Sequence, residues 1–398
     1  MNVWLHRPCA CGKPFGARGV DIEELDGVDL PLCADEKPKN VSCDEPRSHD
    51  AERAHAMIAG PQVGGRQNGR RRGASSGDHR PFEARKRVAE LMLVQQEDGR
   101  GVNPRSVFMR FADRPDCRMI ALPSHLGTPW KTSGLKWVAS YPANVSRGIP
   151  RASAVLLLND HEFGYPFACL EGSVISAART AASAVLAASH LRSGDHHVGT
   201  FGIVGTGLIA RYILRFLVDT EWEIETVELF DVDPSRAERF AASARAMQPS
   251  IDVRIASEMP PLLKSSDLVL FATVASRPHV HDPQLLAHRP VVLHISLRDL
   301  APAVLVDACN IVDDVDHVMR EDTSLHLTEQ LTGTRDFVAG SLAAVITGRC
   351  GVDRARPVVF SPFGLGVLDL AVGKWVHDRA RAAGKLVPIE HFFSDAEL

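Results

Sequence analysis

The stretch His197-Val-Gly-Thr-Phe-Gly-Ile-Val-Gly-Thr-Gly-Leu-Ile-Ala210 decides the fold that this sequence predicts. Its apolar first half predicts a buried strand ending at Val204, and the amphipathic segment from Arg211 to Val218 predicts a helix. The glycine turn between them is typical of a dinucleotide site. Gly205 permits a tight turn, and Gly207 lets the backbone approach a pyrophosphate at the helix N-terminus. The alternative is an ordinary strand–helix turn.

A second predicted strand, Thr226 to Asp231, favours the dinucleotide site over an ordinary turn. Asp231 follows Gly205 by 26 residues, about where a carboxylate meets the adenosine ribose. A carboxylate there repels a 2′-phosphate, so we expect NAD, although Arg236 nearby leaves NADP as an alternative. The predicted cofactor-binding residues are Gly205, Thr206, Gly207, Leu208, Ile209, Asp231, Thr180 and Thr273.

Composition narrows the class of protein. The chain has 398 residues, which leaves room for two domains, and 45% hydrophobic with 24% charged residues is ordinary for a globular protein. A net charge of −4 does not favour a nucleic-acid or membrane partner. No run of about 18 apolar residues predicts a membrane span, and the first residues lack a signal-peptide core. We therefore expect a cytoplasmic protein.

The first 80 residues show little periodicity. Residues 1–56 predict a poorly ordered extension, Met57 to Val63 a short strand, and residues 64–77 a glycine- and arginine-rich linker rather than a nucleic-acid patch. Four of the eight cysteines lie in the first 43 residues without a C-x-x-C pair. Free thiols are favoured there over zinc or disulfides.

The remaining chain alternates in a way that predicts two domains. Short strands between residues 106 and 171 predict a small mixed sheet, followed by a helix from Ser173 to Leu191. Strand–helix alternation then predicts a parallel sheet, helices at 328–331 and 338–347, a strand at 357–360 and a long returning helix over 365–383. The fold class is α/β: a doubly wound parallel Rossmann sheet over 181–316, plus a smaller α+β substrate and dimerisation domain from 57–180 with 317–398.

Three cations occupy positions that favour burial. Lys136 lies in an otherwise apolar strand, Arg179 lies among small residues in the middle of a helix, and Arg110 lies between Met109 and Phe111. A buried cation needs a partner, so each is expected to face a cleft or a carboxylate, although solvent-facing side chains are the alternative. Together they suggest an anionic substrate.

Two acidic stretches follow strands of the predicted parallel sheet. Asp299 comes after the strand ending at Ser296, so it can reach the nicotinamide crevice, or it can cap a helix. Asp313-Asp314-Val-Asp316-His317 resembles a metal cluster in composition only, and solvated acids are the favoured interpretation. We predict no metal site, and no hydrolase, zinc-protease or P-loop motif occurs.

Several motifs together resemble the ornithine cyclodeaminase/mu-crystallin family. They are Gly134-Leu-Lys136-Trp, Glu171-Gly-Ser-Val-Ile-Ser-Ala-Ala-Arg179-Thr-Ala-Ala, the glycine turn, and Ser361-Pro-Phe-Gly-Leu-Gly-Val-Leu-Asp-Leu-Ala371. The resemblance covers about residues 100–398. Within the family, Asn103-Pro-x-Ser-Val-Phe-x-Arg-Phe, Arg147-Gly-Ile-Pro-Arg-Ala-Ser-Ala and Gly164-Tyr-Pro-Phe-Ala-Cys-Leu-Glu-Gly-Ser most resemble the branch of NAD-dependent dehydrogenases acting on N-(2-amino-2-carboxyethyl)-L-glutamate.

This resemblance implies a reaction and a set of roles. It implies oxidative hydrolysis of that tricarboxylate to L-2,3-diaminopropionate and 2-oxoglutarate, for siderophores or nonribosomal peptides. Lys136 and Arg179 match the family's substrate-carboxylate residues, Arg110 matches another, and Asp299 falls at the catalytic aspartate, in a Leu-Arg-Asp-Leu-Ala-Pro context that departs from the glycine-rich version of this motif. We expect Asp299 to act as general acid/base with Lys136 in the catalytic set, Arg147, Arg151 and Arg298 to converge on the substrate, and the chain to form a homodimer. The unusual sequence before residue 83 differs from the family's strand and helix there.

Two other functions stay open at this point. An ornithine cyclodeaminase would recycle NAD within each turnover, converting ornithine to proline and ammonia. A mu-crystallin-like protein would bind the dinucleotide without catalysis. The three cations favour the tricarboxylate, because ornithine requires an acid for its distal amine.

Overall fold

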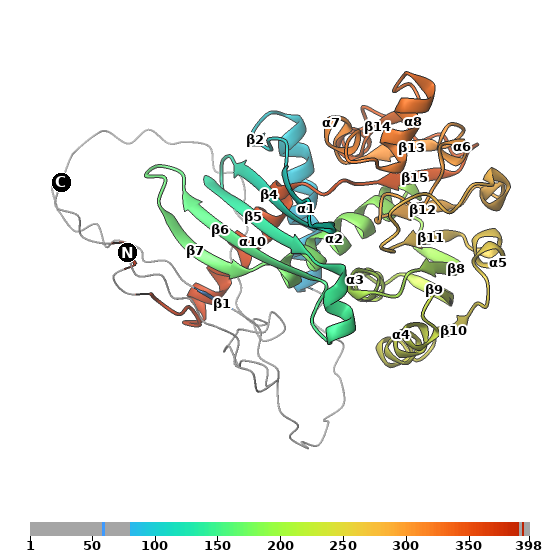
Figure 1. The fold of residues 1–398 in the computed structure, drawn as a ribbon, viewed down its shortest axis with the longest axis horizontal. Coiled ribbons are helices and arrows are strands. Elements are labelled where there is room, and N and C mark those ends of the chain that lie inside the picture. Colours follow the sequence, from blue (N-terminus) through green and yellow to red (C-terminus); the bar gives the residue numbers. More distant parts are fainter. Residues whose placement is uncertain (1–57, 60–79, 390–391, 394–398) are drawn as a thin grey trace, which may run out of the picture.

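The computed structural model of the chain describes residues 58–59, 80–389 and 392–393, and it confirms the α/β class. Two sheets stand side by side with helices between and around them (Figure 1). The predictions for residues 1–56 and for the glycine- and arginine-rich run lie outside the described residues. So do Cys9, Cys11, Cys33 and Cys43, whereas the four described cysteines are free thiols.

The first sheet is the predicted small mixed sheet, in the order β1-β7-β6-β5-β4-β2, with β3 also paired to β4. All its pairs are antiparallel except the parallel pair of β1 and β7. β4 is long because its first half pairs with β3 and residues 118–126 pair with β5. The strands are β1 (Ile58–Ala59), β2 (Gly101–Val102), β3 (Val107–Phe111), β4 (Arg114–Leu126), β5 (Thr132–Ser140), β6 (Ala152–Asp160) and β7 (Pro166–Glu171).

The second sheet is entirely parallel, in the order β10-β9-β8-β11-β12-β15-β13-β14. The order reverses between β8 and β11, and open α/β sheets bind ligands beyond the carboxyl ends of the strands at such a switch point. The glycine turn follows β8 directly. The strands are β8 (His197–Val204), β9 (Glu223–Phe230), β10 (Asp252–Ile255), β11 (Leu268–Phe271), β12 (Val291–His294), β13 (Cys309–Val312), β14 (Val338–Ser341) and β15 (Val358–Ser361).

The helices alternate with these strands as predicted, but α8 begins four residues before the predicted 328 and one further helix differs. The helix expected over 338–347 is instead a strand, β14, followed by a short helix, because Ser341 caps that helix by accepting from the Ala344 N–H. The α-helices are α1 (Arg80–Glu97), α2 (Ser173–Leu191), α3 (Leu208–Asp219), α4 (Pro234–Met247), α5 (Met259–Ser265), α6 (Pro302–Leu305), α7 (Val315–Val318), α8 (Ser324–Thr332), α9 (Leu342–Ile346) and α10 (Gly366–Ala382), with 3-10 helices η2 (Pro142–Arg147) and η3 (Pro283–Leu286).

The proposed division into domains needs one correction at its C-terminal boundary. Residue 316 is not the end of the parallel sheet, because β14 and β15 lie beyond it and pair with β13. The sheet therefore takes in part of the 317–398 segment assigned to the other domain. The boundary at 316 was placed too early, because the chain returns to the parallel sheet after α8 to form β14 and β15.

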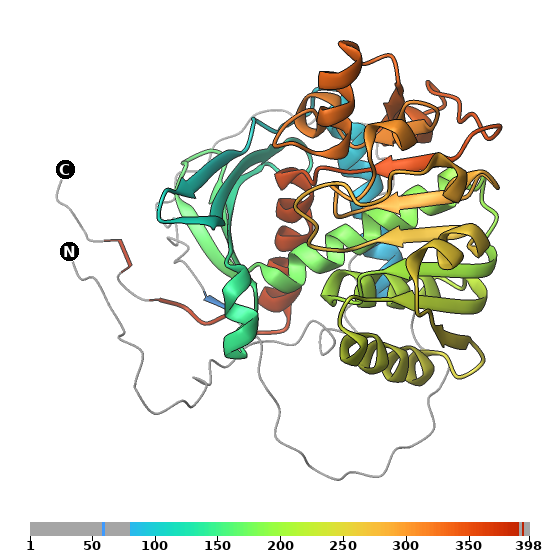
Figure 2. The ribbon, with the colours of Figure 1, turned by 45° about the vertical axis from the view of Figure 1, so that its right-hand side comes forward.

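Helices α2 and α10 lie between the two sheets (Figure 2). α10 packs on β4, β5 and β6, which is the return to the first domain that the sequence predicts. α2 is the one described helix long and apolar enough to cross a membrane, but 72% of its most apolar window is buried inside the protein. Its small residues instead allow close packing between the sheets.

Candidate functional site

The glycine turn lies at the switch point of the parallel sheet. Gly205 has φ +91°, and a Cβ atom there would lie 2.8 Å from the Ala272 carbonyl at the exit of β11. Only glycine fits this conformation without displacing backbone. A Cβ at Gly207 would meet nothing within 4 Å, so open space adjoins the N-terminus of α3. This space suits a pyrophosphate.

Asp231 is held at the end of β9 beside the turn. Its Oδ2 accepts from both the backbone N–H and the hydroxyl of Thr206 at 2.8 Å, and Oδ1 accepts from the Asp233 N–H. Arg236 pairs with Asp233, 3.8 Å away, rather than with Asp231. Among the described residues, the carboxylate at the predicted ribose position therefore forms no ion pair with an arginine.

Large apolar side chains are exposed around this edge of the sheet. Leu208, Val232 and Val274 are 51%, 91% and 73% exposed, and they come just after β8, β9 and β11. Exposed apolar groups gathered at a crevice are typical of a binding site for an aromatic ligand. The residues present therefore fit a dinucleotide. Of the other predicted cofactor residues, Ile209 packs partly into the core and the Thr180 hydroxyl donates to the Ser176 carbonyl.

Lys136 and Arg179 share one buried carboxylate, that of Asp369 on α10. Lys136 Nζ lies 2.6 Å from Asp369 Oδ2, and Arg179 Nε lies 3.2 Å from Oδ1. The Asp369 side chain is fully buried. The two predicted cations thus meet at one place, brought together from β5 and α2. Their two positive charges share the single negative charge of Asp369.

Burial changes the acidity of the Lys136 ammonium group. It lowers the pKa of Lys136 to about 8, with the Arg179 charge acting in the same direction and Asp369 opposing both. A lysine with this pKa gains or loses its proton near neutral pH. Lys136 Nζ also lies 3.3 Å from the Ser176 hydroxyl of α2.

The loop that leads into α10 passes close to the Arg179 guanidinium at Gly364. Gly364 has φ +93°, and a Cβ atom there would lie 2.9 Å from an Arg179 guanidinium nitrogen. Asp313 accepts from the Phe363 and Gly364 N–H groups at 2.8 and 2.7 Å. The expectation that all acids near residue 313 are solvated is therefore wrong for Asp313, which is buried because it anchors this loop.

Asp299 lies in a network of hydroxyl and imidazole groups. Its Oδ1 accepts from the Thr273 hydroxyl at 2.5 Å and lies 3.0 Å from His279 Nε2. Its Oδ2 accepts from the Ser296 hydroxyl and lies 3.3 Å from His294 Nε2. Burial raises the pKa of Asp299, but hydrogen bonds from His279, His294 and Ser296 outweigh it and hold the pKa well below its ordinary value.

His279 is the solvent-facing member of this network. Its side chain is 36% exposed, whereas that of Asp299 is fully buried. An ionised carboxylate only accepts hydrogen bonds, so His279 donates from Nε2 and its Nδ1 is left to exchange a proton. An aspartate that orients a histidine in this way is a known arrangement for acid–base chemistry.

Two of the other predicted cations, Arg110 and Arg298, contact Glu321, and a third, Arg147, does not. Arg110 is half-exposed and pairs with the Glu321 carboxylate, and Arg298 Nη2 donates to the Glu321 carbonyl at 2.5 Å. Arg147 is exposed at the end of η2, and within the described residues no side-chain contact joins it to these arginines. Arg110 and Arg298 thus meet at Glu321 and Arg147 does not join them, and the convergence of Arg147, Arg151 and Arg298 on the substrate stays a prediction.

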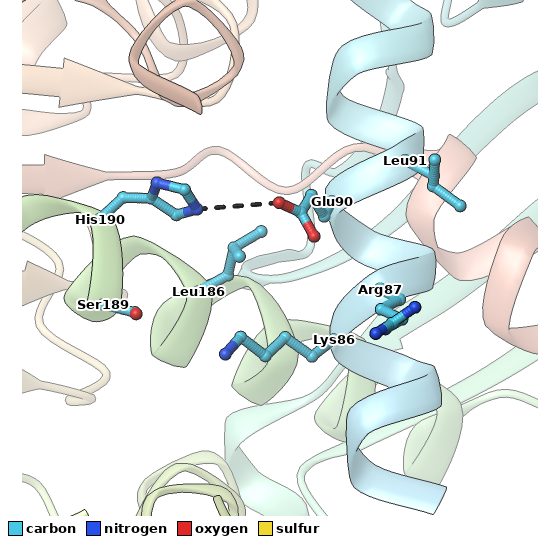
Figure 3. Close-up of a pocket in the computed structure, with 7 residues that line it drawn as sticks. All are labelled: Lys86, Arg87, Glu90, Leu91, Leu186, Ser189 and His190. Atoms are coloured by element: carbon cyan, nitrogen blue, oxygen red, sulfur yellow. Dashed lines mark ion pairs between the residues drawn. The ribbon is translucent and has the colours of Figure 1, made fainter. Parts of the chain in front are cut away.

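A separate pocket of about 390 Å³ lies between α1 and α2 (Figure 3). The ion pair of His190 with Glu90, 3.8 Å long, crosses it. None of the predicted site residues lines this pocket. Its lining consists of Lys86, Arg87, Glu90, Leu91, Leu186, Ser189 and His190.

Sequence reasoning missed two residues of the site. Asp369 stands in the quoted Ser361–Ala371 motif as the one acid of an apolar run, which is a signal of a buried partner. His279 gave no such signal, because it lies in a loop whose course depends on the bridge between Val280 and Leu300.

Comparisons with known proteins agree with this geometry. Residues 78–384 match the model of the ornithine cyclodeaminase/mu-crystallin family. N-((2S)-2-amino-2-carboxyethyl)-L-glutamate dehydrogenase from Staphylococcus aureus is 29% identical over 269 residues, 66% of this chain and 79% of that protein. Alanine dehydrogenase from Archaeoglobus fulgidus is 28% identical over 290 residues, 71% of this chain and 85% of that protein.

Solved structures share the fold. The crystal structure of CmnK superposes with a TM-score of 0.69 at 26% identity, covering 79% of this chain and 97% of that one. Thermococcus litoralis Delta(1)-pyrroline-2-carboxylate reductase, solved with NADH and L-proline, superposes with a TM-score of 0.70 at 22% identity, covering 77% and 96%.

The shared carboxylate leads to a stability prediction. Asp369→Ala leaves the buried Lys136 and the partly buried Arg179 without their partner, and we expect a loss of about 3–5 kcal/mol in the free energy of unfolding, measured by urea denaturation. Asp378→Ala is the matched control, because Asp378 on the same helix makes partly exposed pairs with Lys374 and His377. It should cost about 1 kcal/mol or less. Equal losses in the two variants would contradict the role given to Asp369.

Proposed function

Since the chain belongs to the ornithine cyclodeaminase/mu-crystallin family, we propose that it is an NAD-dependent dehydrogenase that acts on a secondary amine. The proposed substrate is N-(2-amino-2-carboxyethyl)-L-glutamate, and the products are L-2,3-diaminopropionate and 2-oxoglutarate. The Staphylococcus aureus relative bears the name of this activity.

The balance of charge in the site is the observation that carries this proposal. The site's carboxylates, Asp299, Asp369 and Glu321, each already face histidines, lysine or arginines. None is left to bind the distal ammonium group of ornithine. The cations outnumber these acids on the substrate side, which favours a substrate with several carboxylates.

The cofactor in this proposal is NAD, held at the glycine turn with Asp231 on the adenosine ribose. When bound, NAD would accept a hydride from the α-carbon of the substrate's glutamate portion. The exposed apolar groups Leu208, Val232 and Val274 support a planar ligand at this edge. The Asp231 carboxylate supports NAD rather than NADP.

The protein's own groups bind, orient and move protons. Lys136 and Arg179 would bind the carboxylate next to the reacting carbon and so hold the amine nitrogen in place, while Arg110 would meet another carboxylate of the substrate. Loss of the hydride leaves a C=N bond whose nitrogen keeps its proton as an iminium. Water adds to the carbon and gives one proton to His279, which Asp299 stabilises as an imidazolium, so a neutral carbinolamine forms. His279 returns that proton to the nitrogen as the C–N bond breaks, and the hydroxyl proton is released to water as the C=O bond forms.

This assigns Asp299 a different part from the one expected from the sequence. A fully buried carboxylate with four side-chain partners is poorly placed to exchange protons with water. We therefore propose that Asp299 acts through His279. The same proposal includes a homodimer in the cytoplasm that supplies siderophore or peptide natural-product synthesis.

The assay that tests the function uses the full chain with NAD and each substrate in turn. We expect NADH to accumulate at 340 nm with N-(2-amino-2-carboxyethyl)-L-glutamate and not with ornithine. Proline formed from ornithine without net NADH would instead identify a cyclodeaminase. Tight NAD binding with no turnover of either substrate would support a mu-crystallin-like binding protein.

The histidine–aspartate pair leads to a second prediction. His279→Gln should lower kcat/KM by about 10²-fold or more, because the water has no base, while the Kd for NAD stays unchanged. His281→Gln is the matched control, since His281 is exposed two residues further on. It should stay within about twofold of the wild type on the same reasoning. Full activity in His279→Gln would remove this residue from the mechanism.

The acidity of Lys136 leads to a prediction on pH. Its protonated form binds the carboxylate, so kcat/KM should fall as the pH rises through about 8 and Lys136 becomes neutral. Lys136→Arg should move this fall beyond pH 10 or so, because arginine stays charged there. A fall near pH 8 that persists unchanged in Lys136→Arg would assign it to another group.

A further inference from the structure

A row of arginines crosses the inner face of the first sheet. Arg110 on β3 lies directly opposite Arg118 on β4, and Arg118 lies opposite Ser140 on β5. Arg151, just before β6, donates from Nη1 to the Ser140 hydroxyl at 2.7 Å. Lys136 shares this face, because it is four residues from Ser140 on the same strand.

Such an arrangement is unfavourable unless an anion offsets it. Like charges directly opposite on paired strands destabilise a sheet. Arg298 reaches the same row from the loop after β12, and burial and then the charges of Arg298, Arg151 and Arg110 lower the pKa of Arg118. Glu321 supplies one carboxylate, which pairs with Arg110. In the described part of the chain, no side chain forms an ion pair with Arg118.

The loops that face the row adopt costly backbone conformations. Leu297, Glu321 and Asp322 have φ values of +71°, +58° and +52° without being glycines. Residues held in this left-handed region cost free energy and gather at functional sites. Here they present the Arg298 guanidinium and both the carbonyl and the carboxylate of Glu321 to the row.

We propose that Arg118, Arg151 and Arg298 form a second anion subsite, distinct from the pair of Lys136 and Arg179, that binds the distal carboxylate of the substrate. This inference rests on the proposed function, and it makes Arg118 a determinant of substrate choice. Ser140 and Lys136 are about 13 Å apart along the strand, so the long arginine side chains can meet the far end of a substrate whose near carboxylate lies at Lys136. The subsite selects substrates whose distal group is a carboxylate over substrates whose distal group is an amide or an alkyl group.

The test compares two substrates that differ at one group. They are N-(2-amino-2-carboxyethyl)-L-glutamate and its side-chain amide, N-(2-amino-2-carboxyethyl)-L-glutamine, followed as NADH formation. The wild type should prefer the first by about 10- to 100-fold in kcat/KM, because a charge-assisted hydrogen bond is lost with the amide. Arg118→Gln should lose most of this preference by slowing only the first substrate, and Arg151→Gln should do so in part.

The control removes an arginine from elsewhere on the surface. Arg254 on β10 is exposed and pairs with Asp252, so Arg254→Gln changes the net charge equally and should keep the wild-type preference. A wild type that shows no preference, or an Arg118→Gln variant that keeps it, would overturn the subsite while leaving the proposed function intact.

Binding separates failure of the subsite from failure of the reaction. If the wild type turns over neither substrate, the proposed function fails, and calorimetric titration of the NAD-loaded protein with glutarate still tests the row. Glutarate binding that weakens about tenfold in Arg118→Gln and stays unchanged in Arg254→Gln would support the subsite. Equal glutarate binding in all three proteins, or none in the wild type, would overturn it.

Discussion

The buried carboxylate of Asp369 is the constraint on which the site depends. It joins Lys136 and Arg179 across 233 and 190 residues of chain, so β5, α2 and α10 must meet at one point. Removing three charges from water is costly, and the contacts repay that cost only in good geometry. The position of α10 between the two sheets is therefore tied to the place where a substrate carboxylate would bind.

The cluster of Lys136, Arg179 and Asp369 also lies where the chain crosses between the two sheets. α2 carries Arg179 and runs on towards β8 and the glycine turn, while α10 follows β15 through the loop at Gly364. Asp313 holds that loop by its backbone, and Gly364 leaves room for the Arg179 guanidinium. Cofactor side and substrate side are thus connected through two helices and a buried set of charges.

Local patterns predicted the parts of the structure that local rules determine. The bounds of α2 were predictable from sequence, as were the turn at Gly205 and the acid at the end of β9. The strand at 338–341 was not, because its apolar residues fit a helix and only pairing with β13 makes them a strand. The partner of Lys136 and the surroundings of Asp299 depend on contacts between distant segments, so composition and spacing could not reveal them.

The row of arginines has a consequence for how molecules reach the cleft. The whole chain carries a net charge of −4, yet within the described residues this row on the inner face of the first sheet forms one ion pair, that of Arg110 with Glu321. A local positive potential on an acidic protein attracts small anions over distances comparable to the Debye length, about 8 Å at physiological ionic strength. Association of a multiply charged anion should therefore be faster in dilute buffer than in concentrated salt.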